Sequence, residues 1–232
     1  MGKSAKIVIL TGAGISAESG LGTFRDEGGL WAQHRIEDVA TPEGFARNPD
    51  LVHRFYNARR AQAAEARPNA AHQALARLQR EHPGEVVIVT QNVDTLHEAG
   101  GAAEVLHMHG TLAGALCAAC GHRWQAALAM QPQDRCPHCA GTTTRPDVVW
   151  FGEIPYAMQT IETHLAEADL FVSIGTSAQV YPAANLVQAA AATGARTLEF
   201  NLEPSAMATR FDDCRYGPAS KTLPRWVAEI LG

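Results

Sequence analysis

Short β-branched runs alternate with alanine-rich stretches along this chain, and this alternation restricts the possible folds more than any other feature. The runs lie at 7–11, 85–90, 105–107, 170–175 and 196–201, and the alanine-rich stretches with helical spacing lie at 69–80, 159–166 and 183–192. Strands connected by helices form a parallel sheet that the helices cover. We therefore expect an α/β fold built on a parallel sheet.

Two segments interrupt the alternation. Residues 23–68 contain no buried-strand run, are rich in arginine and have helical periodicity over 51–66, whereas residues 111–145 hold four cysteines. We expect these two segments to form a smaller helical and metal-binding lobe within a single domain. The main lobe then consists of residues 1–22, 69–110 and 146–232.

The overall composition excludes several classes of protein. Of the 232 residues 46% are apolar, and no apolar run approaches the roughly 20 residues that span a bilayer, so neither a disordered chain nor a membrane protein is expected. The net charge of −5, with no long basic run, argues against nucleic-acid binding. The N-terminus lacks a secretory apolar segment, and Lys6 stands where myristoylation favours Ser or Thr, so we expect a cytoplasmic protein.

A glycine-rich turn follows the first predicted strand directly. It reads Gly12-Ala13-Gly14-Ile15-Ser16-Ala17, the G-x-G-x-x-A pattern in which the backbone and a helix N-terminus hold a pyrophosphate. A tight strand-to-helix turn without a ligand is the alternative. The acidic residue expected about 20 positions later has no clear counterpart, so the ribose must be held differently.

Polar residues follow the other predicted strands. The clusters are Gln91-Asn92-Val93-Asp94, His107-Met108-His109-Gly110, Gly175-Thr176-Ser177 and Asn201-Leu202-Glu203. Any one of them could be a helix cap. Together they predict a single ligand crevice, because the carboxyl ends of parallel strands meet at one edge of the sheet.

The cysteine spacing predicts a zinc site. Two Cys-x-x-Cys pairs are separated by fifteen residues and consist of Cys117, Cys120, Cys136 and Cys139. This spacing is typical of a tetrahedral module, and four thiolates leave no position for water, so the metal should be structural. His122 and His138 are alternative ligands, a disulfide is a further alternative, and Cys214 is interpreted as a small apolar filler.

The combined motifs resemble the sirtuins, and among them the bacterial class III NAD-dependent protein deacylases that prefer malonyl and succinyl groups. The resemblance extends from about residue 7 to residue 220. Its motifs are the glycine turn with Ser19-Gly20 and Thr23-Phe24-Arg25, the segment 91–94, His109-Gly110, the four cysteines, and the segments 175–177 and 201–203. Gly22 is a departure from the pattern, because most of the family has Pro at this position.

The resemblance implies a Rossmann-type lobe and a small zinc-binding lobe, with NAD and an acyl-lysine peptide in the cleft between them. It assigns the diphosphate and nicotinamide ribose to 12–17 and to Thr23, Phe24 and Arg25. It assigns the nicotinamide ribose and carboxamide to 91–94. The adenosine side falls to Gly175, Thr176, Ser177, Asn201, Leu202, Glu203 and Ala219.

The resemblance also implies the reaction. The acyl-lysine carbonyl oxygen attacks C1′ of the nicotinamide ribose, and the products are nicotinamide, free lysine and O-acyl-ADP-ribose. Asn92 and His109 would be the catalytic residues, with His109 as the general base, a role that suits an imidazole with an ordinary pKa of about 6.5. His107 is interpreted as structural.

Substrate contacts are implied at two places. The segment Val148-Val149-Trp150-Phe151-Gly152-Glu153 resembles the edge to which the peptide adds as a strand, although it could be an ordinary apolar β segment. Tyr56 and Arg59 share one helix face, resemble the pair that binds the carboxylate of malonyl or succinyl groups, and accompany a small residue, Ala40. The alternative is that Arg59, beside Arg54 and Arg60, only solvates the helix.

Three other functions remain open from the sequence. A mono-ADP-ribosyltransferase would use the same cleft, a non-catalytic zinc-binding adaptor would release no nicotinamide, and a conventional dehydrogenase would reduce NAD. The expected partners are acylated lysine side chains of proteins, with neither a membrane nor a nucleic acid.

Overall fold

The main body of the protein is a six-stranded parallel sheet. The computed structural model describes residues 5–22, 30–177 and 185–232, and the strand order in these residues is β3-β2-β1-β7-β8-β9. The strands are β1 (Ile7–Thr11), β2 (Val86–Thr90), β3 (Val105–His107), β7 (Leu170–Ile174), β8 (Arg196–Asn201) and β9 (Asp213–Tyr216). The α/β fold and the five predicted strands are confirmed. The edge strand β9 was not predicted, because its sequence, Asp-Cys-Arg-Tyr, is neither apolar nor fully buried.

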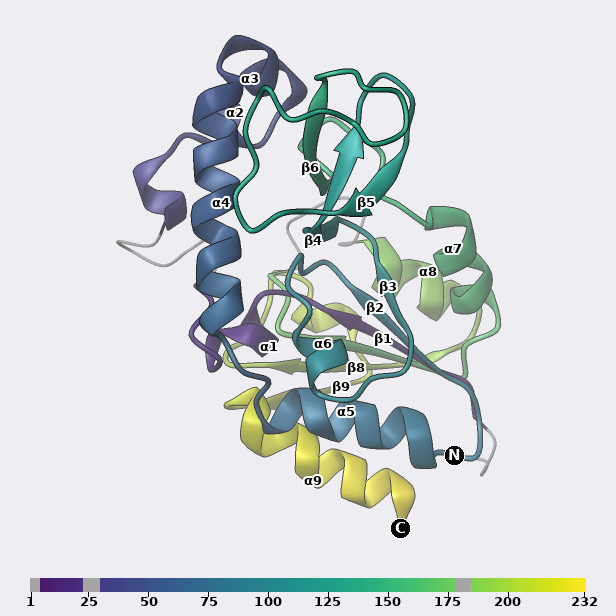
Figure 1. Ribbon diagram of the computed structural model, residues 1–232. Coiled ribbons are helices and arrows are strands. Elements are labelled where there is room, and N and C mark those ends of the chain that lie inside the picture. Colours follow the sequence, from purple (N-terminus) through teal and green to yellow (C-terminus); the bar gives the residue numbers. More distant parts are fainter. Residues whose placement is uncertain (1–4, 23–29, 178–184) are drawn as a thin grey trace.

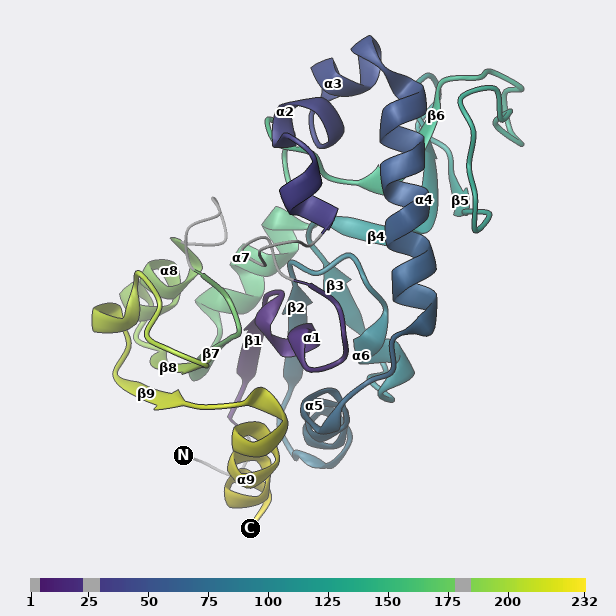
Figure 2. The same ribbon diagram turned by 90° about the vertical axis from the view of Figure 1, so that its left-hand side faces the viewer.

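Helices cover both faces of this sheet, as Figures 1 and 2 show. Ile7 and Ile9 of β1 belong to the core shared with α5 (Ala70–Glu81) and α9 (Ala219–Leu231). Val8 and Leu10 belong to the opposite core, shared with α7 (Met158–Ala166) and α8 (Leu186–Ala192). Because successive strand residues point to opposite faces, a strand buried on both sides is apolar throughout.

The predicted helices agree with the structure except at their ends. Asn69 is the N-cap of α5, where its side chain accepts from the Ala71 N–H and the His72 ring accepts from the Asn69 N–H. The helix predicted at 183–192 corresponds to α8, which begins at Leu186. Residues 183 and 184 lie outside the described residues. Helix α9 was not expected; it contains Pro224, which normally disfavours a helix interior.

A three-stranded antiparallel sheet with the order β5-β4-β6 forms the second part of the molecule. Its strands are β4 (Gly110–Cys117), β5 (Arg123–Gln125) and β6 (Thr144–Val148), and the helices beside it are η1 (Leu30–Gln33), α2 (Ile36–Val39), α3 (Pro42–Arg47) and α4 (Pro49–Glu65). We call this part the small lobe and the six-stranded sheet with its helices the large lobe. Figure 1 shows the small lobe at one end of the molecule, with α4 running from it toward α5.

The small lobe has its own apolar core, in which Val52 and Phe55 of α4 pack with Leu112 of β4 and Trp150. Three short elements complete the described chain: α1 (Gly14–Ala17), α6 (Leu96–Ala99) and η3 (Ala208–Arg210). Within the described residues, no helix combines the length and apolar character needed to cross a membrane.

Candidate active site

One cavity of about 1090 Å³ lies where the large and small lobes meet. Its large-lobe wall consists of segments that follow the carboxyl ends of the parallel strands, and its small-lobe wall includes residues of α4 and of the segment 148–153. Every described residue that the sequence singled out for NAD or substrate lines this cavity, with the exception of Ile15. Ile15 is fully buried in the core instead, and Thr23, Phe24 and Arg25 lie outside the described residues.

The glycine turn packs tightly against a second glycine loop. A Cβ added to Gly12 would lie 2.8 Å from the carbonyl oxygen of Gly175, and one added to Gly14 would lie 2.7 Å from the Gly175 Cα. The Gly14 N–H donates to this same carbonyl at 2.8 Å, so it is not free to hold a phosphate as the sequence pattern suggested. The glycines are therefore required for the contact between the two loops, which brings two stretches of backbone to the cavity wall.

A buried hydrogen-bond network joins the glycine turn to the segment after β2. The Asn92 amide donates to the Ser16 hydroxyl at 3.1 Å, and this hydroxyl donates to Asp94 at 3.1 Å. Because Nδ1 of His72 accepts from the Asn69 N–H, its proton is on Nε2, which lies 3.4 Å from the Ser16 oxygen. Burial raises the pKa of Asp94 and lowers that of His72 to about 4, so His72 is neutral.

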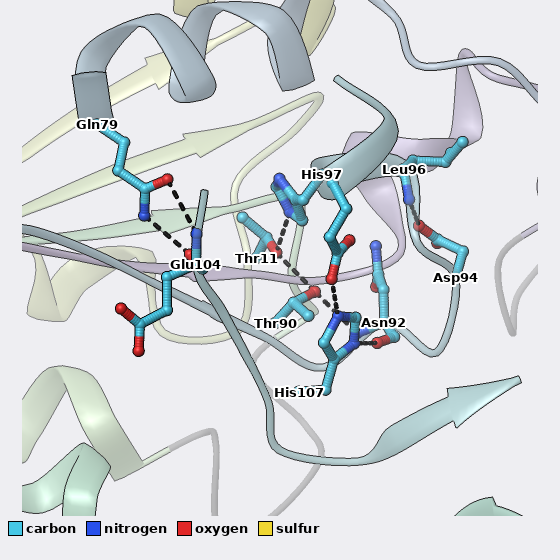
Figure 3. A network of polar contacts seen from close by, with 10 residues as sticks. Thr11, Gln79, Thr90, Asn92, Asp94, Leu96, His97, Glu104 and His107 are labelled. Atoms are coloured by element: carbon cyan, nitrogen blue, oxygen red, sulfur yellow. Dashed lines mark hydrogen bonds and ion pairs between the residues drawn. The ribbon is translucent and has the colours of Figure 1, made fainter. Parts of the chain in front are cut away.

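A second network supports Asn92 from behind (Figure 3). Nδ1 of His107 lies 3.2 Å from the Asn92 carbonyl oxygen and Nε2 lies 2.7 Å from a Glu98 carboxylate oxygen. Both partners only accept, so both ring nitrogens donate and His107 carries a positive charge. Burial opposes this charge, but Glu98 raises the pKa of His107 above its ordinary value. The structural role expected for His107 is thus to anchor the backbone of Asn92.

His109 presents one ring nitrogen to the cavity as a proton acceptor. Its Nδ1 donates to the carbonyl oxygen of Gln91 at 3.0 Å, so the neutral ring carries no proton on Nε2. Burial lowers the pKa of His109, which keeps the ring neutral at pH 7. A neutral imidazole with a fixed tautomer is the arrangement that a general base requires.

The segment 148–153 connects the two lobes beside His109. The Val149 N–H donates to the His109 carbonyl and the Phe151 N–H donates to the Ala40 carbonyl, each at 2.9 Å. Glu153 was expected to contact substrate, but both of its carboxylate oxygens accept from Arg145, at 2.6 and 2.8 Å. Its carboxylate therefore holds the segment in place.

On the adenosine side assigned by the resemblance, two side chains hold one loop. The Gln91 amide donates to the Thr176 hydroxyl at 3.0 Å, and the Asn201 amide donates to the Thr176 carbonyl at 2.9 Å. These contacts connect the ends of β2, β7 and β8. Glu203, which the resemblance also assigns to the adenosine side, lines the same cavity.

Three arginines of α4 have three different environments. Arg54 is exposed, whereas Arg60 is buried and donates to the Leu112 carbonyl at 2.7 Å. Arg59 lines the cavity, with its guanidinium carbon 4.9 Å from the ring centroid of Trp31 and 5.6 Å from that of Tyr56. No carboxylate among the described residues lies within ion-pair distance of Arg59. Burial lowers its pKa, and the side chain does not merely solvate the helix.

The four paired cysteines fit a zinc ion. Their sulfur atoms all lie within 4.8 Å of one another, with Cys117 and Cys139 3.6 Å apart and Cys120 and Cys136 3.7 Å apart. A tetrahedral ion with Zn–S bonds of about 2.3 Å requires sulfur separations of about 3.8 Å.

The geometry does not support the two alternatives to a four-cysteine zinc site, which are histidine ligands and a disulfide. The rings of His122 and His138 stack on each other and are not part of the ligand group that the described residues form. None of the cysteines is in a disulfide. Cys214 is on β9 of the large lobe, where it is partly exposed and donates to the Ala208 carbonyl.

The cavity also contains residues that the sequence did not single out. Trp31, Gln62, Ala63 and Leu112 line it from the small lobe. Trp150 also lines the wall. It belongs to the segment 148–153, but the sequence indicated no individual role for it in substrate binding. Apolar and aromatic residues carry no local sign of whether they face a cavity or the core, so only the packing distinguishes them.

Comparison with known proteins identifies close relatives. A model of the Sir2 family matches residues 12–182. A protein of Caulobacter vibrioides named NAD-dependent protein deacylase is 55% identical over 230 residues, which cover 97% of each chain, and one of Pasteurella multocida with the same name is 51% identical over the full length of both. A solved Sir2 homologue in complex with NAD is 36% identical, with a TM-score of 0.90 over 98% of this chain and 91% of that one. Another Sir2 structure, which holds a deacetylated p53 peptide and 3′-O-acetyl ADP-ribose, is 26% identical with a TM-score of 0.83 over 96% and 92% of the two chains.

Proposed function

We propose that this chain, which belongs to the Sir2 family and is an NAD-dependent protein deacylase, prefers lysine acyl groups that end in a carboxylate, such as malonyl and succinyl. The products would be nicotinamide and O-acyl-ADP-ribose. The observation that carries this proposal is the placement of a neutral His109 and of Arg59, without a carboxylate partner among the described residues, on the walls of one cavity. The two Cys-x-x-Cys pairs, arranged as metal ligands and not as disulfides, also favour a reducing, cytoplasmic location.

The large lobe would hold NAD. When bound, NAD supplies a ribose carbon that bears nicotinamide as a leaving group. The close-packed loops at Gly12, Gly14 and Gly175 provide backbone at the cavity wall, and the network of Ser16 and Asn92 provides fixed amide and hydroxyl groups. Such preorganised dipoles act without reorganisation during the reaction.

His109 would move the proton. Its Nε2 accepts a proton from a hydroxyl group in the cavity, while Nδ1–H remains bonded to the Gln91 carbonyl and keeps the ring oriented. His107, whose two nitrogens are both occupied as donors, cannot perform this role. The zinc ion, with four thiolate ligands, has no open position and would only stabilise the small lobe.

The small lobe would select the acyl group. The Arg59 guanidinium can bind a distal carboxylate through two hydrogen bonds, and the Tyr56 hydroxyl beside it offers a third. The small side chain of Ala40 in the same wall leaves space for a longer acyl group. A charge-assisted hydrogen bond contributes about 1.5–3 kcal/mol, so a preference of roughly tenfold or more over acetyl is expected.

The test is an assay of the purified protein with NAD and three peptides that differ only in an acetyl, malonyl or succinyl group on one lysine. We expect nicotinamide release and a mass of O-acyl-ADP-ribose that follows the acyl group, with the highest kcat/KM for the acidic groups. Reactions without NAD are the control.

The competing functions give different results in the same assay. A target protein that gains the mass of ADP-ribose would indicate an ADP-ribosyltransferase, and absence of nicotinamide release with every peptide would indicate an adaptor. Absorbance of reduced nicotinamide would indicate a dehydrogenase. Equal kcat/KM on all three peptides would contradict the acyl preference alone.

A further inference from the structure

Trp150 lies between the acyl end of the cavity and the segment that connects the lobes. Its indole Nε1–H donates to the Tyr56 hydroxyl oxygen at 3.0 Å, and both side chains are only 2% exposed. An indole nitrogen can only donate, so the Tyr56 oxygen has to accept in this bond. The Tyr56 hydroxyl hydrogen is consequently left to donate to a different group.

The indole ring is held by both its backbone and its face. The Trp150 N–H donates to Glu153 at 2.8 Å, and the guanidinium carbon of Arg145 stands 3.4 Å from the centroid of the indole. Arg145 is itself immobilised, because it donates twice to Glu153 and once to the Val148 carbonyl, at 2.7 Å. The position of the indole N–H is thus determined by a partly buried ion pair and not by the indole alone.

The Tyr56 hydroxyl and the Arg59 guanidinium consequently both act as donors at this end of the cavity. Tyr56 has its oxygen occupied by Trp150, and Arg59 is a permanent donor with no carboxylate partner among the residues the structure describes. A hydroxyl that could rotate would adapt to either a donor or an acceptor on the ligand. A hydroxyl whose oxygen is already bonded discriminates in favour of an acceptor, such as a carboxylate.

We propose that Trp150 is a specificity-determining positioning residue, whose indole N–H makes the Tyr56 hydroxyl a hydrogen-bond donor to the distal carboxylate of the acyl group. The pair of Arg145 and Glu153 holds the indole in the required orientation. This inference rests on the proposed acyl preference. It adds that Trp150 contributes to this preference indirectly, by orienting the Tyr56 hydroxyl.

The test compares Trp150→Phe, Tyr56→Phe and the double variant with the wild type. Phenylalanine keeps an aromatic ring over Arg145 but has no N–H. We expect Trp150→Phe to lower the ratio of kcat/KM for succinyl to kcat/KM for acetyl peptide by about threefold to tenfold, mainly through the KM for the succinyl peptide. Trp226→Phe, in the large-lobe core and also 2% exposed, is the matched control and should leave the ratio unchanged.

The double variant separates positioning from packing. If Trp150 acts through the Tyr56 hydroxyl, the ratio in the double variant should equal that of Tyr56→Phe alone. A role in packing only would reduce kcat/KM for both peptides alike, and the two losses would multiply in the double variant. That outcome would overturn the inference.

A measurement without activity tests the bond itself. The chain has four tryptophans, and the indole N–H resonance that disappears in Trp150→Phe identifies the one of interest. In Tyr56→Phe this resonance should move toward the position of an unbonded indole and its exchange with solvent should accelerate. An unchanged resonance would refute this inference, even if the wild type shows the expected acyl preference. If the wild type shows no such preference, the proposed acyl preference fails, and this inference fails with it.

Discussion

The two lobes obtain their stability from different sources. The large lobe buries apolar residues on both faces of its sheet, so that β1, β2 and β7 are buried along their whole length. The small lobe has one modest apolar core and a three-stranded sheet in which β5 is mostly exposed, and it adds four cysteines arranged for a metal. A lobe with too little apolar surface to bury requires a further source of folding free energy, and a structural metal supplies it.

The two cavity walls differ in the same way. The large-lobe wall presents backbone, amides, hydroxyls and one imidazole, which the proposed function assigns to NAD and to proton transfer. The small-lobe wall presents aromatic rings and the guanidinium of Arg59, which it assigns to the acyl group. Under this proposal the chemistry and the selectivity of the enzyme belong to different lobes and are separable by mutation.

The largest expected effect comes from removing the metal. Cys117→Ser should abolish zinc binding, which contributes on the order of 10 kcal/mol in small zinc modules, and should unfold the small lobe while the large lobe stays folded. Hydrogen exchange should show lost protection in β4 and β6 but retained protection in β1 and β2. Activity should disappear as well, because β4 runs from Gly110, next to His109, to Cys117.

The matched control is Cys214→Ser, which removes a thiol of the large lobe. It should retain zinc and protection in both lobes. A metal-free Cys117→Ser protein with full deacylation activity would contradict the dependence of the small lobe on zinc.

Loss of the proposed base comes next. His109→Tyr should reduce kcat with every acyl peptide by about 10²- to 10⁴-fold, because it removes a general base and no acyl contact. Zinc content and thermal unfolding should match the wild type. The ratio of the residual kcat/KM values on the different acyl peptides should also match. A folded variant with normal turnover would exclude His109 as the base.

A smaller and selective effect is expected at the other wall. Arg59→Met should lower kcat/KM for the succinyl peptide by about tenfold to a hundredfold and change that for the acetyl peptide much less, since only the succinyl group carries a distal carboxylate. Arg54→Met, an exposed arginine on the same helix, serves as the control. Equal losses on both peptides would indicate that Arg59 is needed for folding or for NAD, and not for the carboxylate.

The last prediction concerns the acid stability of the large lobe. Burial lowers the pKa of His97 to about 3 and of His72 to about 4, far below the ordinary 6.5 of the unfolded chain. The unfolded chain therefore binds protons that the native state does not, and the free energy of unfolding should fall as the pH decreases from 6.5 toward 4. Each such histidine contributes at most about 1.4 kcal/mol per pH unit.

Hydrogen exchange of β1 and β2 measures this free energy within the large lobe. The pH slope should be shallower in His97→Gln than in the wild type, and unchanged in the control His34→Gln of the small lobe. Equal slopes in the wild type and His97→Gln would mean that His97 is not buried as a neutral ring.

Sequence patterns predicted the local structure well where periodicity and spacing carry the information. The five apolar strands, the helix α4 and the grouping of the four cysteines all follow from patterns within short stretches. Patterns failed for the polar edge strand β9 and for α9, whose Pro224 argues against a helix although its apolar face packs on α5. In these two elements tertiary contacts outweigh local propensity.

The candidate site divides in the same manner. Residue identity and order along the chain were enough to indicate a dinucleotide turn, a tetrathiolate metal and a cleft at the strand ends. Only the folded chain distinguishes Arg54, Arg59 and Arg60, which are neighbours on one helix but face solvent, the cavity and the Leu112 carbonyl. Likewise, Trp150 contacts Tyr56 across 94 residues. Periodicity reports which residues share a face, but the partner that covers that face comes from distant parts of the chain, so it is decided by packing in three dimensions.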